Sequence, residues 1–216
     1  MTAVQPPGSV PGARVSPETA APAVSPFADP APLGLAGFAL TTFVLSFMNT
    51  GLFKAEPVVF GLAFAYGGVA QLLAGMWEFT RGNTFGATAF SSYGAFWLSY
   101  WYLTGHTNVT TVAPHDLNKG VGLYLLGWGI FTLLMLAAAL KTNIALISVL
   151  ALLAATYVIL AIGNFHATVG ATTPNGIIKL GGWVGLVTAA AAWYTAFAIV
   201  LNATNKRTVL PLMPRE

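Results

Sequence analysis

The sequence predicts an all-α membrane protein with six transmembrane helices, and three observations lead to this fold class. Hydrophobic residues make up 56% of the 216 residues and charged residues only 7%, whereas soluble domains carry about 25% charged residues. Six apolar segments follow residue 32, each about 20 residues long, which is the length that crosses a bilayer as a helix. Runs such as 133–140 do not alternate between apolar and polar residues, which disfavours a transmembrane β-barrel.

The residues before the first span have a different composition. Eight of the 13 prolines lie in residues 1–32, mixed with Ala, Ser and Val, and this composition predicts a disordered Pro/Ala-rich N-terminal tail. No apolar stretch of about 7 to 15 residues follows Arg14 within this segment, so the segment does not have the pattern of a signal peptide. We therefore expect a tail at 1–32, a transmembrane domain at 33–203 and a basic C-terminal tail at 204–216.

Each predicted span ends where polar residues or proline interrupt the apolar run. In chain order, the spans cover residues 33–53, 58–79, 84–104, 120–140, 144–163 and 180–201. The breaks between them cover residues 54–57, 81–83, 106–119, 141–143 and 164–179. Every proline after the tail lies in a break or at the C-terminal end. Because proline is the residue that most often kinks a helix, we expect unkinked helices.

The basic residues predict the orientation of the chain in the membrane. With six spans, both termini share one side with the breaks at 81–83 and 141–143. That side collects six of the nine Lys and Arg residues, and the other side collects three. Because cytoplasmic loops carry the excess of basic residues, we expect a multi-pass protein of the cell membrane with both termini in the cytoplasm.

Composition also excludes several kinds of site. The chain has no cysteine, so it has no disulfide, thiolate metal site, iron–sulfur cluster or Cys nucleophile. Its basic residues form no stripe, which disfavours nucleic-acid binding. No Asp, Glu, Lys, Arg or His lies in the middle of a span, and Glu78 and Lys119 lie at span ends. This pattern disfavours an ion pump, a symporter with a buried carboxylate, and haem or metal cofactors.

The sequence lacks the motifs of common hydrolases. No Gly-x-Ser-x-Gly or His-Glu-x-x-His pattern occurs, so we expect the protein not to be an enzyme. The three histidines, His106, His115 and His166, lie in breaks or at a span end. We interpret them as solvated or structural residues and expect neither a cofactor nor a bound metal.

Hydroxyl and aromatic residues share one face of the first predicted helix. Phe38, Thr41, Thr42, Leu45 and Asn49 recur at intervals of three or four residues, so they lie on one face. Such hydroxyls either bond back to their own helix and join helices together, or form a polar strip along a narrow path for a small solute. The pattern alone leaves both interpretations open. The Gly181–Gly185 spacing is more typical of helix packing than of a pore.

The start of the first span has a distinctive motif. An acidic residue and two prolines directly precede the apolar run, in the order Asp29, Pro30, Ala31, Pro32, Leu33, Gly34 and Leu35. Asp29 is placed to cap the helix, and Pro32 suits its first turn. The free N–H groups and the positive end of the helix dipole would favour a nearby anion.

This motif resembles the Asn-Pro-Ala-Pro-Leu-Gly-Leu signature of the acetate uptake transporter family, whose bacterial members include succinate–acetate permeases. One departure is that Asp29 stands where the family usually has Asn, which puts substrate contact by this residue in question. The resemblance continues along nearly all of the chain after the tail. It includes residues 66–71 (YGGVAQ), 82–86 (GNTFG), 89–97 (AFSSYGAFW), 161–164 (AIGN) and 207–211 (RTVLP).

The resemblance implies a cyclic hexamer of six-helix protomers, with a path for acetate and related short carboxylates such as succinate through each protomer. It implies an apolar constriction at the positions of Phe38, Tyr93 and Leu153. It also implies that Thr41 and Ser92 bind the carboxylate. We add Asn49, which shares the face of Thr41, to the predicted substrate-binding residues.

Two other functions stay open from the sequence. One is a membrane sensor or scaffold, in which the tail and the basic C-terminal end would be the working parts. The other is a channel for a neutral small solute such as ammonia or water. Because no fixed cation is predicted along the path, a carboxylate would be held by O–H groups and helix ends.

Overall fold

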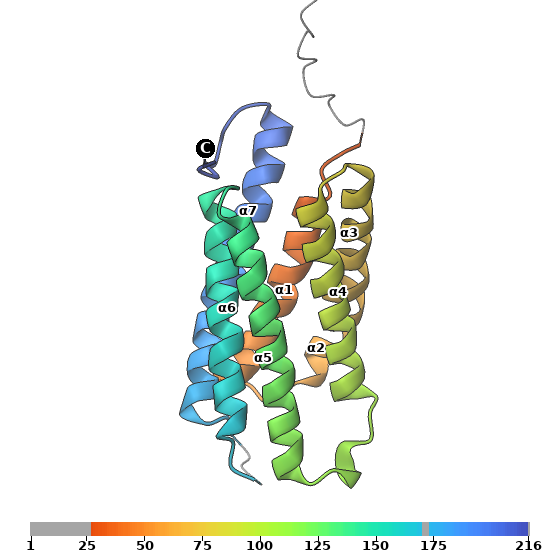
Figure 1. Cartoon of the computed structure of the whole chain (residues 1–216), viewed down its shortest axis with the longest axis vertical. Coiled ribbons are helices and arrows are strands. Elements are labelled where there is room, and N and C mark those ends of the chain that lie inside the picture. Colours follow the sequence, from red (N-terminus) through yellow and green to blue (C-terminus); the bar gives the residue numbers. More distant parts are fainter. Residues whose placement is uncertain (1–26, 170–172, 216) are drawn as a thin grey trace, which may run out of the picture.

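The computed structural model describes residues 27–169 and 173–215, and regular structure in these ranges is helical. The long helices lie roughly along one axis and form a bundle (Figure 1). The elements, in chain order, are α1 (Ala31–Thr50), α2 (Pro57–Phe64), the π-helix η1 (Ala65–Ala70), α3 (Gln71–Thr80), α4 (Thr84–Gly105), the 3₁₀-helix η2 (Val109–Thr111), α5 (Pro114–Ala139), α6 (Ile144–Phe165) and α7 (Gly176–Asn205). The tail predicted at residues 1–26 lies outside the described residues.

Five helical segments in the described ranges are long and apolar enough to cross a membrane. They are α1, the continuous α2–η1–α3 segment, α5, α6 and α7. The protein is thus an all-α, multi-pass membrane protein. The third predicted span corresponds to α4, which has 22 residues but is less apolar because it carries several Ser, Thr, Tyr and Gly residues.

Three prolines and four asparagines mark the starts of helices. Proline occupies the first turn of α1, α2 and α5, where a missing N–H costs no helix hydrogen bond. The side chains of Asn83, Asn143 and Asn175 each accept a hydrogen bond from an N–H in the first turn of α4, α6 and α7, and Asn108 does so for η2. These caps satisfy N–H groups that have no partner within the helix.

Two helices begin earlier than hydropathy predicts. The fourth predicted span starts at residue 120, but α5 starts at Pro114 and includes Lys119. The sixth starts at residue 180, but α7 starts at Gly176. The start is set by Pro114 and by the Asn175 cap, since helical hydrogen bonding does not require the first turn to be apolar.

The second predicted span departs from a continuous α-helix. The segment Ala65–Ala70 is a π-helix between α2 and α3. No proline lies in it, so proline positions did not reveal this irregularity. Gly67 is buried against α1 and α4: an added Cβ there would lie 2.7 Å from Thr41 Oγ1 and 2.9 Å from Trp97 Cδ1. The π-helix thus lies where three elements meet at close range.

The residues after α7 fold back onto the start of α6. The backbone N–H groups of Ile144 and Ala145 donate to the carbonyls of Met213 and Leu212, at 3.0 and 3.3 Å. Residues 206–215, part of the predicted basic tail, are therefore held against the bundle. We name residues 207–215 the C-terminal strap.

Candidate substrate path

Two cavities lie within the described part of the bundle. The larger has a volume of about 660 Å³, and the smaller has a volume of about 150 Å³. The larger cavity is lined by the C-terminal parts of α1 and α4, including Asn49 and Thr104. The smaller is lined by their first turns, including Ala31 and Phe85. The two cavities therefore lie toward opposite ends of α1 and α4.

Two side chains form part of both cavity walls. Phe38 and Leu153 line the larger cavity and also the smaller one, and both are almost fully buried. Tyr93 lines the smaller cavity, with its ring centroid 6.1 Å from that of Phe38. The three residues predicted to form a constriction thus lie together, where an apolar layer separates the two cavities.

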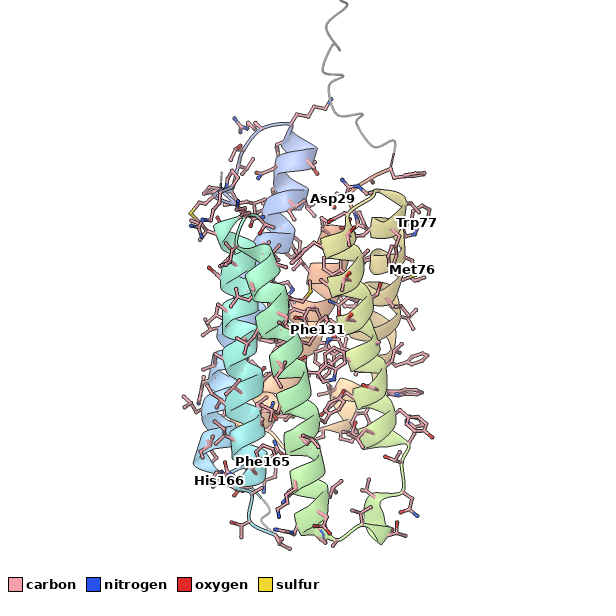
Figure 2. All side chains as sticks on the ribbon, viewed as in Figure 1. Asp29, Met76, Trp77, Phe131, Phe165 and His166 are labelled. Atoms are coloured by element: carbon pink, nitrogen blue, oxygen red, sulfur yellow. The ribbon has the colours of Figure 1, made fainter. Side chains whose placement is uncertain are left out.

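Tyr93 is held in place by residues of α5. Its hydroxyl donates to Thr132 Oγ1 of α5 at 3.0 Å, and the Thr132 hydroxyl donates to the Trp128 carbonyl. The ring of Phe131 packs edge-on against Tyr93 with centroids 5.5 Å apart. In Figure 2, Phe131 lies near mid-height, whereas Asp29 and His166 lie toward opposite ends of the bundle. The apolar layer is therefore near the middle of the molecule.

The three predicted substrate-binding residues have different surroundings. Asn49 lines the larger cavity. Thr41 is fully buried, donates to the Gly37 carbonyl at 2.8 Å and lines neither cavity. Ser92 is half-buried and also lines neither cavity. For Thr41, the hydroxyl bonds back to its own helix, which is the alternative that the pattern left open.

Other polar residues on the walls were not singled out as site residues. Thr42 and Ser46 line the larger cavity, while Gln71 and Thr195 line the smaller one. Periodicity placed both Thr41 and Thr42 on the face of Phe38, and the choice between them depends on the rotation of α1. Gln71 lies at the junction of η1 and α3, and the sequence gives no sign of this π-helix.

The cavity walls carry almost no formal charge. Of the described side chains that line either cavity, Glu56 is the one charged group, and it lies at the loop end of the larger cavity. A small anion in these cavities would be bound by neutral donors such as hydroxyl and amide groups, which provide hydrogen bonds without a fixed positive charge. Such binding is weaker than an ion pair and permits release.

The entrance motif caps α1 and lines part of the smaller cavity. Asp29 Oδ1 accepts a hydrogen bond from the Ala31 N–H at 3.0 Å and pairs with the Arg81 guanidinium at 2.6 Å. Ala31 and Leu35 lie on the wall of the smaller cavity, whereas Leu33 is exposed on the outside. The carboxylate that replaces the family's Asn is therefore accompanied by a cation and by the helix end.

Glu78 is completely buried at the end of α3. One of its carboxylate oxygens accepts a hydrogen bond from Asn83 Nδ2 at 2.9 Å, and Asn83 in turn caps α4. Its other oxygen has no partner among the described residues. The sequence placed Glu78 at a helix end but did not predict its burial, which depends on the tight turn between α3 and α4. Within the described ranges, no three His, Asp or Glu residues cluster as a metal site would require.

Comparison with known proteins identifies the family. A model described as the GPR1/FUN34/yaaH family matches residues 11–215. The chain belongs to this family. The resemblance to the acetate uptake transporters that the sequence predicts is therefore confirmed.

Several proteins similar to this chain have transport names. The chain is 41% identical to Acetate permease A of Emericella nidulans, over 86% of this chain and 66% of that protein's length. It is 41% identical to the Succinate-acetate/proton symporter SatP of Escherichia coli K12, over 86% of this chain and 95% of that protein. It is also 41% identical to Ammonia transport outward protein 2 of Saccharomyces cerevisiae, over 90% of this chain and 69% of that protein.

The fold of the family member described as "the bacterial acetate channel SatP" is similar. The two structures superpose with a TM-score of 0.77 at 40% sequence identity, covering 86% of this chain and 99% of that chain. The helical bundle is thus the channel fold of this family.

Proposed function

We propose that the protein is a channel or transporter for acetate and related short-chain carboxylates such as succinate. The observation that carries the proposal is the position of Phe38 and Leu153 on the walls of two cavities toward opposite ends of the bundle. A solute that crosses the protomer passes this apolar layer. The similarity to proteins named as an acetate permease and a succinate-acetate/proton symporter supports the choice of substrate.

The chemistry of the path suits a small carboxylate with an apolar end. The apolar layer of Phe38, Tyr93 and Leu153 disfavours a fully hydrated ion such as chloride, while it accommodates the methyl group of acetate. Asn49 offers an amide donor on the wall of the larger cavity. Substrate contacts by Thr41 and Ser92 stay predictions.

We further propose that α4 is a sixth membrane span and that the protomers form a hexamer. Support for the span comes from the length of α4, 22 residues, and from the position of its two ends at opposite cavities. Large apolar side chains such as Leu134 and Trp183 are exposed on the outside of the protomer, where lipid or neighbouring copies would cover them. Mass measurement in nanodiscs tests the hexamer, since a mass of one chain contradicts it.

The central test is uptake of labelled acetate into proteoliposomes. The protein should accelerate uptake over empty liposomes, and unlabelled succinate should compete. Phe38→Ala and Tyr93→Ala remove rings from the apolar layer, so entry of a bulkier monocarboxylate such as butyrate should rise by about tenfold relative to acetate. Phe197→Ala, which removes an exposed ring from α7, serves as the control.

Uptake equal to that of empty liposomes would reject transport and favour the sensor or scaffold alternative. If the protein transports acetate but Phe38→Ala and Tyr93→Ala leave butyrate selectivity unchanged, the constriction is elsewhere.

A neutral-solute channel is a second candidate, because one relative is named an ammonia transport protein. The neutral cavity walls suit ammonia as well as a carboxylate. Stopped-flow measurement of internal pH after an ammonium pulse separates the two functions. The neutral-solute candidate would be favoured if the protein conducts ammonia, if neither acetate nor succinate inhibits this flux, and if the protein takes up no acetate.

A further inference from the structure

Thr42 differs from the other buried threonines. The described residues include seven threonines that are at most 6% exposed. Six of them donate to a carbonyl three or four residues earlier in their own helix, which is the usual partner for a threonine in a membrane helix. They are Thr41, Thr50, Thr132, Thr156, Thr188 and Thr195. The hydroxyl of Thr42 has no partner in the same part of the chain, and Thr42 lines the larger cavity.

A second donor on the same cavity wall is also unpartnered. Trp97 of α4 is 2% exposed and lines the larger cavity. Its indole Nε1–H, which can only donate, has no acceptor among the residues that the structure describes. A buried donor without a partner is unfavourable, and here the two residues that carry such donors both line one cavity. A ligand with acceptor oxygens would satisfy both.

The two donors have the same position relative to the apolar layer. Thr42 follows Phe38 by four residues on α1, and Trp97 follows Tyr93 by four residues on α4. Both helices run in the same direction, from the smaller cavity toward the larger one (Figure 1). Each donor residue therefore lies about 6 Å along the helix axis, slightly more than one helical turn, on the larger-cavity side of a constriction residue.

Helix geometry directs each donor side chain toward the aromatic ring that lies one turn earlier in the same helix. Side chains in an α-helix lean toward the N-terminal end, so the side chain at each position covers the turn before it. Thr42 thus leans toward Phe38, and Trp97 leans toward Tyr93. Both donor atoms are closed to water in this state.

We propose that Thr42 and Trp97 form a carboxylate-binding site next to the constriction, which becomes accessible when Phe38 and Tyr93 move apart. This site specifies how the proposed transporter would bind its substrate, and it rests on the proposed transport function. Its substrate is a short carboxylate in the ionised form, whose two oxygens accept from the hydroxyl and the indole N–H. New hydrogen bonds to the carboxylate offset the unfavourable opening of the apolar layer. The constriction then opens more readily for a carboxylate than for a solute without acceptors.

The first test removes each donor in turn; Thr42→Val keeps the shape of the side chain, whereas Trp97→Phe also reduces the size of a buried ring. In acetate uptake by proteoliposomes, Thr42→Val and Trp97→Phe should each raise the half-saturating acetate concentration about tenfold, as for loss of one hydrogen bond to a charged group. Thr42→Ser, which keeps the hydroxyl, should behave as the unmodified protein does. Thermal stability of Thr42→Val should not fall, because its hydroxyl has no partner to lose.

Thr188→Val is the matched control. Thr188 is fully buried and lines neither cavity, and its hydroxyl bonds the Val184 carbonyl and contacts the Thr156 hydroxyl. The same chemical change there should lower thermal stability and leave the half-saturating concentration unchanged. If the role of Thr42 is purely structural, Thr42→Val should instead lower thermal stability and leave the half-saturating acetate concentration unchanged.

The second test does not depend on transport. The chain has six tryptophans, so the indole N–H region of a ¹⁵N spectrum is simple, and Trp97→Phe assigns the Trp97 signal. Titration with acetate should move this signal in a saturable way, and chloride at the same ionic strength should not. An unmoved Trp97 signal, or an unchanged half-saturating concentration in both variants, overturns the proposal. Absent acetate uptake by the unmodified protein would reject the proposed function, while the Trp97 signal would still decide whether the site binds acetate.

Discussion

Individual glycines permit the close packing of the bundle. Gly182 of α7 faces the end of α1, where an added Cβ would lie 2.5 Å from the Thr50 backbone nitrogen and 2.8 Å from the Ser46 carbonyl oxygen. Backbone atoms cannot turn aside as a flexible side chain can, so the helices would have to separate. The small-residue pattern that the sequence shows at Gly181 and Gly185 is thus explained by packing: added Cβ atoms there would meet Leu160 and Ser46.

Gly182→Ala should therefore destabilise the protein by about 1–3 kcal/mol, which is typical of overpacking in a buried contact. Gly127→Ala is the control, since no heavy atom lies within 4 Å of an added Cβ at that position of α5. Alanine there should be neutral or stabilise the helix by up to about 1 kcal/mol. Thermal unfolding in detergent measures both changes, and equal melting temperatures for the two variants would contradict this account of α1–α7 packing.

The predicted site residues differ in how far the sequence could place them. Phe38, Tyr93 and Leu153, the three residues of the predicted constriction, all line the smaller cavity, and their role as a constriction stays a prediction. Thr41 and Thr42 both have hydroxyls and nearly the same helical position. Only the observed rotation of α1 places Thr42 on the cavity wall and Thr41 against the π-helix.

At the scale of elements, the C-terminal strap joins α7 to α6. The Asn202 side chain accepts from the N–H groups of Val209 and Leu210 at 2.6 and 3.0 Å and donates to the Leu210 carbonyl at 2.8 Å. The Tyr194 hydroxyl donates to the Pro211 carbonyl. Further along, the strap caps the free N–H groups at the start of α6. This arrangement gives a structural role to the 207–211 motif found in the sequence.

Asn202→Ala removes three of these hydrogen bonds and should lower stability by about 1–3 kcal/mol. Asn202→Asp keeps an acceptor oxygen for the Val209 and Leu210 N–H groups and loses the donor, so the loss of stability should be smaller than in Asn202→Ala. Hydrogen exchange locates the effect, because the Ile144 and Ala145 N–H groups depend on strap carbonyls. These two amides should exchange faster in Asn202→Ala, and unchanged protection would show that the strap stays in place without Asn202.

Helix boundaries were predictable where a polar break or a proline marks them. The first, third and fifth spans begin within two residues of the expected positions. The π-helix Ala65–Ala70 was not predictable from the sequence, since its residues have no periodicity that differs from that of an α-helix. Its shape depends on contacts with α1 and α4, which lie elsewhere in the chain.

At the scale of the whole molecule, six spans require that successive loops lie on alternate sides of the membrane. With both termini in the cytoplasm, as the basic residues predict, the loops at 54–57 and 106–119 lie outside and those at 81–83 and 141–143 lie inside. The absence of cysteine allows single cysteines to report the side directly. In intact cells, Lys54→Cys and His106→Cys should react with a membrane-impermeant maleimide, and Thr80→Cys and Lys141→Cys should react only after permeabilisation. If Thr80→Cys and His106→Cys react from the same side, α4 does not span the membrane.

The sequence by itself determined the class of the protein and the general nature of its path. Few charges and long apolar runs commit the chain to a bilayer, since a charged residue in hydrocarbon costs free energy whatever its neighbours. The tertiary structure decided which polar groups line the cavities, that Glu78 is buried, and that the strap covers the start of α6. These features depend on how helices are rotated and packed against partners far away in sequence, and hydropathy carries no information about such contacts.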